Sequence, residues 1–208
     1  MRRFTLAILF LGACSLASAQ SILTVKLGTF NPVDAKAGLI AGLTYGRQVD
    51  ERVDFGLGAD LFIRKFKQET TVNTDTTLSG SNVSEKQTNI DYSMYGLPLM
   101  AHLNVRFLPQ SRVQPYVGLA GGYEIVFSRE ANYEADVKEN RLYAGFGWQA
   151  MVGGEFALGS ASGILAEVLY NGCTVKRSTG SNGAGFPTHE ELDFSGFGFR
   201  VGVRLGGM

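Results

Sequence analysis

Residues 53–65 alternate almost perfectly between apolar side chains and small or polar ones. Successive side chains of a β-strand point to opposite faces, so this segment predicts one apolar face and one polar face. Several later segments repeat the pattern at a length that can cross a bilayer. A transmembrane barrel requires this pattern, because lipid contacts its outer face and its inner face is polar. The two sets are Val53, Phe55, Leu57, Ala59, Leu61 and Ile63 against Asp54, Gly56, Gly58, Asp60, Phe62 and Arg64.

The N-terminus has the three parts of a secretory signal. Arg2 and Arg3 precede an apolar stretch over 4–11, and the small residues 17–19 follow it. We therefore expect a signal peptide over 1–19, with cleavage after Ala19. The apolar stretch is too short for a membrane-spanning helix. The mature chain, residues 20–208, is then expected to form a single domain.

An alternative interpretation of the same region remains open. Residues 11–14 read Leu-Gly-Ala-Cys, which resembles a bacterial lipobox. Cys14 would then be lipidated instead of leaving with the signal. Both interpretations predict an exported protein.

Composition argues against several classes of partner and cofactor. The 19 basic and 19 acidic residues cancel, so nothing indicates a nucleic-acid partner. If Cys14 is removed, Cys173 is the sole cysteine, which excludes an intrachain disulfide and a cysteine-based metal site. The two histidines do not make a metal site, and no cofactor is expected. After the signal no apolar run reaches 18 residues, although 45% of the residues are hydrophobic.

Turn-rich breaks divide the mature chain into eight expected strands, joined by connections of alternating length. The connections after the second, fourth and sixth strands are short, whereas those after the third, fifth and seventh are long and polar. This sorting is typical of an outer-membrane barrel, with turns in the periplasm and loops outside. The fold class is thus all-β, a transmembrane eight-stranded antiparallel up-and-down β-barrel. The strands are expected near 22–30, 38–48, 52–66, 91–107, 113–128, 141–157, 163–174 and 193–206.

The charged residues in these strands lie at alternate positions that share one face (one parity), and this face is expected to point into the lumen. The opposite parity carries no charge at mid-strand, where we find Leu43, Leu57, Leu99, Leu119, Val152, Val168 and Val201. An Arg or Lys facing lipid at the midplane costs about 2–4 kcal/mol. A soluble lipocalin-like barrel would show the reverse arrangement. The lumen-facing charges are Lys26, Asp54, Asp60, Arg64, Arg106, Glu124, Glu155, Glu167, Arg200 and Arg204.

Outward-facing aromatic residues gather toward both ends of the strands. Two girdles of this kind are expected where amphipathic rings meet lipid headgroups. The girdle near the short turns comprises Tyr45, Phe55, Phe107 and Phe156, and the girdle near the long loops comprises Tyr95, Phe127, Phe146, Tyr170 and Phe197.

Two glycine- and aromatic-rich segments resemble a known family. Residues 114–123 (QPYVGLAGGY) and 147–155 (GWQAMVGGE) look like the central hairpin of small OmpA/OmpX-type outer-membrane barrels, and residues 196–206 are similar to their closing strand. The resemblance implies a bacterial outer-membrane protein that contacts membrane lipid and the outer-membrane assembly machinery. It departs at the C-terminus, where such barrels usually end in an aromatic residue and this chain ends Leu-Gly-Gly-Met. A second departure is Pro98 inside the fourth strand, where we expect a β-bulge.

The lumen charges are expected to form a paired network. An eight-stranded barrel is just wide enough for its own side chains, and unpaired buried charges are costly. The network is either a structural plug or a charged gate, and many inward glycines keep a narrow passage open as an alternative. In this expectation cations Lys26, Arg64, Arg200 and Arg204 pair with Asp60, Glu124, Glu155 and Glu167.

No catalytic constellation is visible in the sequence. His102 is expected to be a hydrogen-bonded lumen residue, and His189 lies in the last long loop. The segment 67–89, rich in Thr, Ser and Asn, is expected to be a flexible exposed loop. We therefore expect a non-enzymatic structural or surface-interaction protein whose polar loops contact the exterior and possible ligands. The alternative is a porin-like passage or small-ligand carrier through the charged, glycine-rich lumen.

Overall fold

The computed structural model describes residues 20–76, 82–132, 137–159, 162–181 and 187–206. The expected signal peptide lies outside these ranges. No helix long and apolar enough to cross a membrane occurs among the described residues. The strands are β1 (Gln20–Pro32), β2 (Gly38–Asp50), β3 (Val53–Thr76), β4 (Asn82–Arg106), β5 (Val113–Asn132), β6 (Val137–Ala157), β7 (Ser162–Ser181), β8 (Pro187–Asp193) and β9 (Gly196–Leu205).

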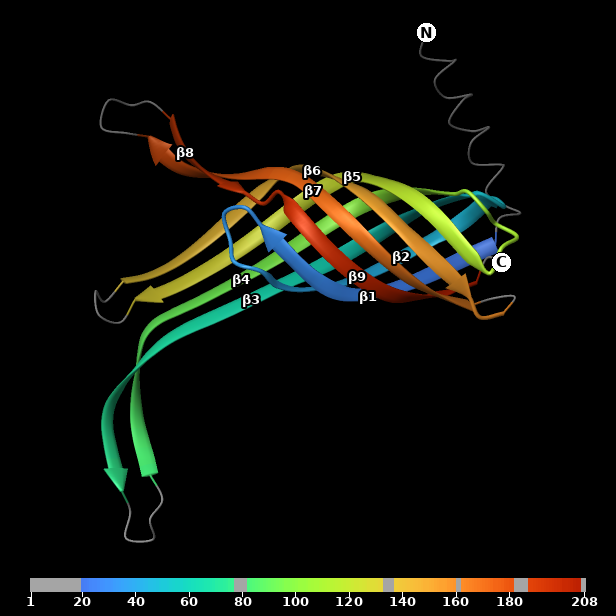
Figure 1. Ribbon diagram of the computed structural model, residues 1–208. Coiled ribbons are helices and arrows are strands. Elements are labelled where there is room, and N and C mark those ends of the chain that lie inside the picture. The colour runs from blue at the N-terminus through green and yellow to red at the C-terminus, as the bar shows by residue number, and fades with distance from the viewer. Residues whose placement is uncertain (1–19, 77–81, 133–136, 160–161, 182–186, 207–208) are drawn as a thin grey trace.

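These strands form one antiparallel sheet that closes on itself. Sequential neighbours pair from β1 through β7, and β1 also pairs with β9. Because β9 pairs with β7 as well, the ring is complete, as Figure 1 shows. A closed sheet satisfies the backbone hydrogen bonds of every strand without an exposed edge. The predicted all-β, up-and-down barrel is confirmed.

The strand expected over 193–206 is interrupted. Both β8 and β9 pair with β7, β8 along its far end and β9 along its first half, so together they occupy one position in the ring. The break falls at Phe194 and Ser195. There the backbone N–H of Phe194 donates to the carbonyl oxygen of Cys173 (2.9 Å), and Val33 N–H donates to that of Ser195 (2.8 Å). Phe194 keeps the inward direction of the even-numbered positions of β9, and its side chain is buried in the lumen.

The strands extend well beyond the ring at one end of the barrel only, as Figure 1 shows. The start of β1, the end of β9, the β2–β3 and β4–β5 connections and the adjoining ends of β6 and β7 lie at one end, whereas β3–β4, β5–β6 and β7–β8 continue as hairpins beyond the ring at the other. The expectation of a loop over 67–89 was wrong, because β3 continues to Thr76 and β4 begins at Asn82, paired across the strands with register shifts at Gln68/Glu69 and Thr71/Asn73. Threonine-rich segments have high β-propensity, and an antiparallel partner was already in place.

Pro98 does not cause the expected bulge. The β3–β4 register is the same on both sides of it, with Ala59 opposite Leu99 and Phe62 opposite Gly96. On its other side Pro98 stays in register opposite Glu124. The strand therefore accommodates the missing N–H without a change of register.

The outer face of the ring is an uncharged apolar band. Its mid-strand residues are exposed, among them Leu57 (66%), Leu119 (61%) and Val152 (64%). Near the long end, the ring of Tyr170 lies between those of Trp148 and Phe197, with centroids 5.6 and 4.9 Å away. A surface of this kind is stable only against an apolar medium. Of the outward aromatic set, Tyr45, Phe55, Phe107, Phe127, Phe146, Phe156 and Phe197 are exposed, and Tyr95 and Tyr170 are partly so.

The β3–β4 extension is expected to be dispensable for barrel formation. The last β2–β3 pair involves Ile63, and β4 pairs with β5 only from Ile90 onward. Replacing residues 70–88 by a short Gly-Ser linker should therefore preserve folding, measured as the heat-dependent gel mobility shift of the refolded protein. Loss of that shift would mean that the extension contributes to the barrel itself.

Placing a charge on the apolar band should destabilise the barrel in a lipid bilayer. Leu119→Arg is expected to lower the free energy of unfolding by about 2–4 kcal/mol, because the guanidinium would face the acyl chains. Leu119→Met, which keeps an apolar side chain, should change it by less than about 1.5 kcal/mol. Denaturant titration in vesicles measures both values. Equal stabilities would show that this face does not contact lipid.

Candidate functional site: the barrel lumen

Nine of the ten charges expected to face the lumen are buried there, each at most 8% exposed. They come from seven of the barrel's strands, and strand alternation alone directs them inward. The tenth, Arg64, is only partly buried. The buried set is Lys26, Asp54, Asp60, Arg106, Glu124, Glu155, Glu167, Arg200 and Arg204.

Glu167 is the centre of an upper ion cluster, which comprises Lys26, Asp60, Glu167 and Arg200. Lys26 Nζ lies 3.1 Å from both carboxylate oxygens of Glu167, and Arg200 Nε donates to Oε1 at 2.6 Å. Arg200 also reaches Asp60 Oδ2 at 2.8 Å. The hydroxyl of Tyr116, a residue that the sequence did not single out, donates to Glu167 Oε2 at 2.6 Å. Two cations face two anions, so the cluster is neutral and its charges are compensated.

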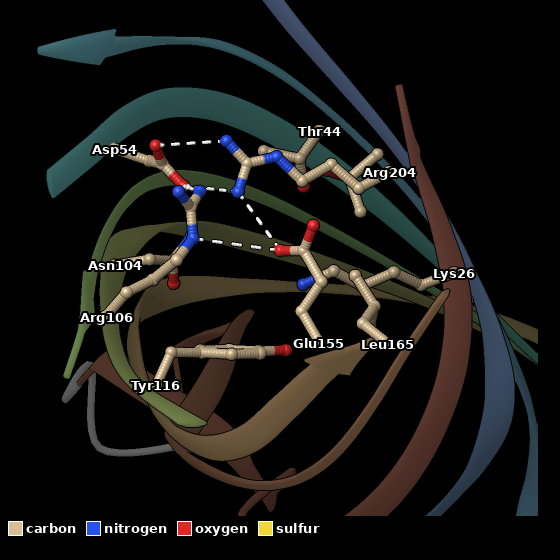
Figure 2. A pocket seen from close by; sticks show the side chains of 10 residues that line it. Lys26, Thr44, Asp54, Asn104, Arg106, Tyr116, Glu155, Leu165 and Arg204 are labelled. Atoms are coloured by element: carbon tan, nitrogen blue, oxygen red, sulfur yellow. Dashed lines mark hydrogen bonds and ion pairs between the residues drawn. The ribbon is translucent and has the colours of Figure 1, made fainter. Parts of the chain in front are cut away.

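A lower ion cluster, nearer the chain ends, comprises Asp54, Arg106, Glu155 and Arg204 (Figure 2). Arg204 Nη1 lies 3.1 Å from both Asp54 Oδ2 and Glu155 Oε2. Arg106 pairs with Asp54 and lies 3.7 Å from Glu155 Oε2. This cluster is also neutral. Asp54 and Arg106 have lumen parity in the sequence, but only the fold shows that they complete the Glu155–Arg204 pair.

Two members of the expected network lie outside both clusters. Glu124 is fully buried, accepts from Asn171 Nδ2 at 3.2 Å, and makes no ion pair with any described residue. Arg64 lies beyond the clusters, toward the long end of the barrel. The expected pairing was therefore wrong for these two. Parity fixes the face of a residue but not its height along the barrel axis, which decides the partners within reach.

An aromatic layer, formed by Phe30, Phe62 and Phe194, closes the lumen above the ion clusters. The ring centroids lie 5.3–5.7 Å apart in edge-to-face arrangements. Each ring is at most 2% exposed, within an apolar cluster that includes Met94, Met100 and Leu169. Phe62 has lumen parity in the sequence, but the expectation of a polar lumen did not include this layer. Phe194 has the same even parity as Arg200 and Arg204, and it was missed for the same reason.

Inward glycines lie beneath the large lumen side chains. A Cβ at Gly147 would collide with the Glu124 carboxylate, one at Gly58 with the His102 ring, and one at Gly153 with the Tyr116 phenol. Neighbouring side chains therefore already occupy the space that these glycines leave. The pocket among the lower-cluster residues has a volume of about 30 Å³, room for only one or two waters.

The two histidines and the cysteine do not assemble a reactive site. His102 is buried in the lumen, and its Nδ1 has no hydrogen-bond partner among the described residues. His189 Nε2 lies 3.1 Å from Glu191 on the exposed β8 hairpin. Cys173 is a buried free thiol. Within the described ranges, no group of three metal-ligating side chains comes together.

The hairpin extensions carry their own charged pairs. Lys176 Nζ lies 2.6 Å from Glu191 across β7–β8, and this ammonium group holds the pKa of the Glu191 carboxyl below its usual range. On β6, Arg141 pairs with Glu139 and lies 3.7 Å from Glu130 of β5. Exposed pairs of this kind contribute little to stability. They leave the long end of the barrel polar and mixed in charge.

Solved outer-membrane barrels resemble the fold over most of its length. OprG from Pseudomonas aeruginosa matches with a TM-score of 0.57 at 14% identity, covering 90% of this chain and 95% of that one. Neisserial surface protein A matches with 0.51 at 14% identity, over 90% and 96%. A major outer membrane protein from Thermus thermophilus matches with 0.54 at 10% identity, over 89% and 98%.

No curated protein matches the sequence. A family model, the outer membrane protein beta-barrel domain, matches residues 5–204, which is nearly the whole chain. The closed antiparallel ring, the apolar outer band and the solved relatives agree with that match. This chain belongs to the outer membrane protein β-barrel family.

Proposed function

We propose that this protein is a non-enzymatic outer-membrane barrel with a closed lumen, which acts through the hairpins and mouth at its long end. The main observation behind this proposal is that side chains fill the lumen at successive heights along the barrel axis. Along the inward face of β3, Asp54 belongs to the lower ion cluster, Asp60 to the upper ion cluster, and Phe62 to the aromatic layer. Recognition of external partners then falls to the polar extensions.

The proposed orientation places the chain ends and short turns in the periplasm. Residues 1–19 serve as the export signal in this proposal, and lipidation at Cys14 is the alternative. The outward aromatic residues near the two strand ends then lie at the lipid headgroups. Insertion requires the outer-membrane assembly machinery, as for other barrels of the family.

The alternative function is a narrow passage or small-ligand carrier. The inward glycines motivated it, but neighbouring side chains occupy the space above Gly58, Gly147 and Gly153. Each ion cluster is internally neutral, whereas a gate for ions would present excess charge of one sign along a continuous path. These observations favour the structural plug over the gate.

A catalytic role is not supported by the side chains of the described residues. His102 lies in the lumen on β4, and His189 lies on the exposed β8 hairpin with Glu191 as its partner. A hydrolase would need a nucleophile and a base within hydrogen-bond reach of each other. The proposal therefore treats the protein as a binding or structural element of the membrane.

Planar-bilayer recording tests the closed lumen. The refolded mature protein is expected to insert without discrete current steps, because two ion clusters and an aromatic layer block the axis. Insertion is verified separately by the heat-dependent gel mobility shift. Reproducible current steps from the correctly folded protein would overturn the proposal in favour of the passage.

Loss of Arg200 should strongly destabilise the barrel. Arg200→Met leaves the buried Asp60 carboxylate without its ion-pair partner, so the free energy of unfolding should fall by about 3–5 kcal/mol. Arg112→Met, an exposed arginine in a short turn, is the matched control and should cost less than about 0.5 kcal/mol. Similar values for the two variants would argue against a structural role for the upper ion cluster.

A further inference from the structure

A second pocket lies at the long-end mouth of the barrel and has no assigned role. Its volume is about 280 Å³, and it is lined by the β1–β2 connection together with β3, β4 and β5. The connection contributes Asp34 and Lys36, β3 contributes Arg64 and Phe66, β4 contributes Tyr92, and β5 contributes Glu130. We call it the mouth pocket.

The mouth pocket is the blind outer end of the lumen. Tyr92 packs against the apolar cluster that contains the aromatic layer, and Arg64 and Phe66 follow Phe62 on the same face of β3. Its strand residues have the parity of the lumen, so the pocket faces the barrel axis and not the lipid. A ligand would therefore enter from the external medium.

The pocket is lined by two cations and two acids, and both acids have partners outside it. Asp34 Oδ2 accepts the backbone N–H of Asp193 at 2.8 Å, and Glu130 lies 3.7 Å from Arg141 Nη1. No described carboxylate pairs with Arg64 or Lys36. The Arg64 Nε is buried and has no hydrogen-bond acceptor among the described residues. The Arg64 side chain as a whole is only partly buried and lines the pocket, so its guanidinium can donate to an anion there.

Aromatic rings provide the second half of the site. Lys36 Nζ lies 4.4 Å from the centroid of the Phe66 ring, a cation–π contact that holds the ammonium group beside an apolar surface. Tyr92 adds a second ring, partly buried against the apolar cluster. Guanidinium and aromatic groups side by side fit a ligand that combines an acidic group with a flat apolar body.

The wall of the pocket is held in place before any ligand arrives. Val33 N–H donates to the Ser195 carbonyl oxygen at 2.8 Å, and Asp34 N–H donates to that of Asp193 at 3.1 Å. With the Asp193 N–H bond to the Asp34 carboxylate, three hydrogen bonds tie the connection to the β8–β9 break. A pre-organised wall reduces the entropy lost on binding.

We propose that the mouth pocket binds a small organic anion, with its carboxylate, sulfonate or phosphate on Arg64 and Lys36 and its apolar body against Tyr92 and Phe66. The inference rests on the proposed function, since a closed lumen retains the ligand at the exterior. The pocket volume lies near the lower end for ligand sites, which limits the ligand to about one ring.

The test uses the refolded mature protein in detergent and 4-fluorobenzoate as the probe, with binding followed by ¹⁹F NMR. Saturable binding is expected, and 4-fluorobenzyl alcohol, which has the same ring without the charge, should bind at least about tenfold more weakly. Arg64→Gln and Lys36→Gln should each weaken binding, Arg64→Gln by about tenfold or more. Lys65→Gln is the matched control, because this exposed neighbour lies on the opposite face of β3.

Three results would overturn the proposal: no saturable binding, equal binding of acid and alcohol, or equal loss in Arg64→Gln and Lys65→Gln. The mobility shift verifies that each variant is folded. If Arg64→Gln does not fold, Lys36→Gln carries the test, because Lys36 lies in a connection outside the strands. Absent binding without bilayer currents would reject the mouth pocket alone, whereas current steps would reject the closed lumen.

Discussion

The structure depends on the two different media that each strand must face. Lipid excludes charge from the outer face, so strand alternation sends every mid-strand charge to the inner one. An eight-position ring leaves little room inside, and the inward charges must compensate one another. The structure meets this requirement with two neutral clusters, in which Glu167 collects Lys26, Arg200 and Tyr116, and Asp54 and Glu155 share Arg106 and Arg204. Side-chain pairing and barrel closure are therefore two consequences of one constraint.

Glycine placement follows from the same lack of space. Large side chains such as Glu124, His102 and Tyr116 lie over the neighbouring strand, at positions where a Cβ would collide with them. The positions beneath them are Gly147, Gly58 and Gly153. A glycine-rich lumen thus accompanies a filled barrel, and glycine content alone does not indicate a passage. The same sequence feature supported opposite interpretations until the neighbouring side chains were placed.

The sequence predicted the ring because alternation is a local property of each strand. Parity placed Lys26, Asp60 and Glu167 inside correctly, but it contains no information on height along the axis, so Arg64 and Glu124 were assigned partners that they do not reach. The continuation of β3 and β4 beyond the ring was missed because a polar, threonine-rich hairpin exposed on both faces lacks the apolar alternation by which strands were identified. Phe194 has lumen parity, but it was missed because the lumen was expected to be polar throughout and the aromatic layer was not anticipated.

The inward face of β3 shows how the lumen changes along its axis. Asp54 and Asp60 belong to ion clusters, Phe62 to the aromatic layer, and Arg64 to the mouth pocket. Phe62 separates the two environments, because its buried ring excludes water between the upper ion cluster and the exterior. Arg64 lies beyond that ring, out of reach of the carboxylates that compensate Arg200 and Arg204. A cation in this position cannot contribute to the plug, and its charge is available to the medium outside the barrel.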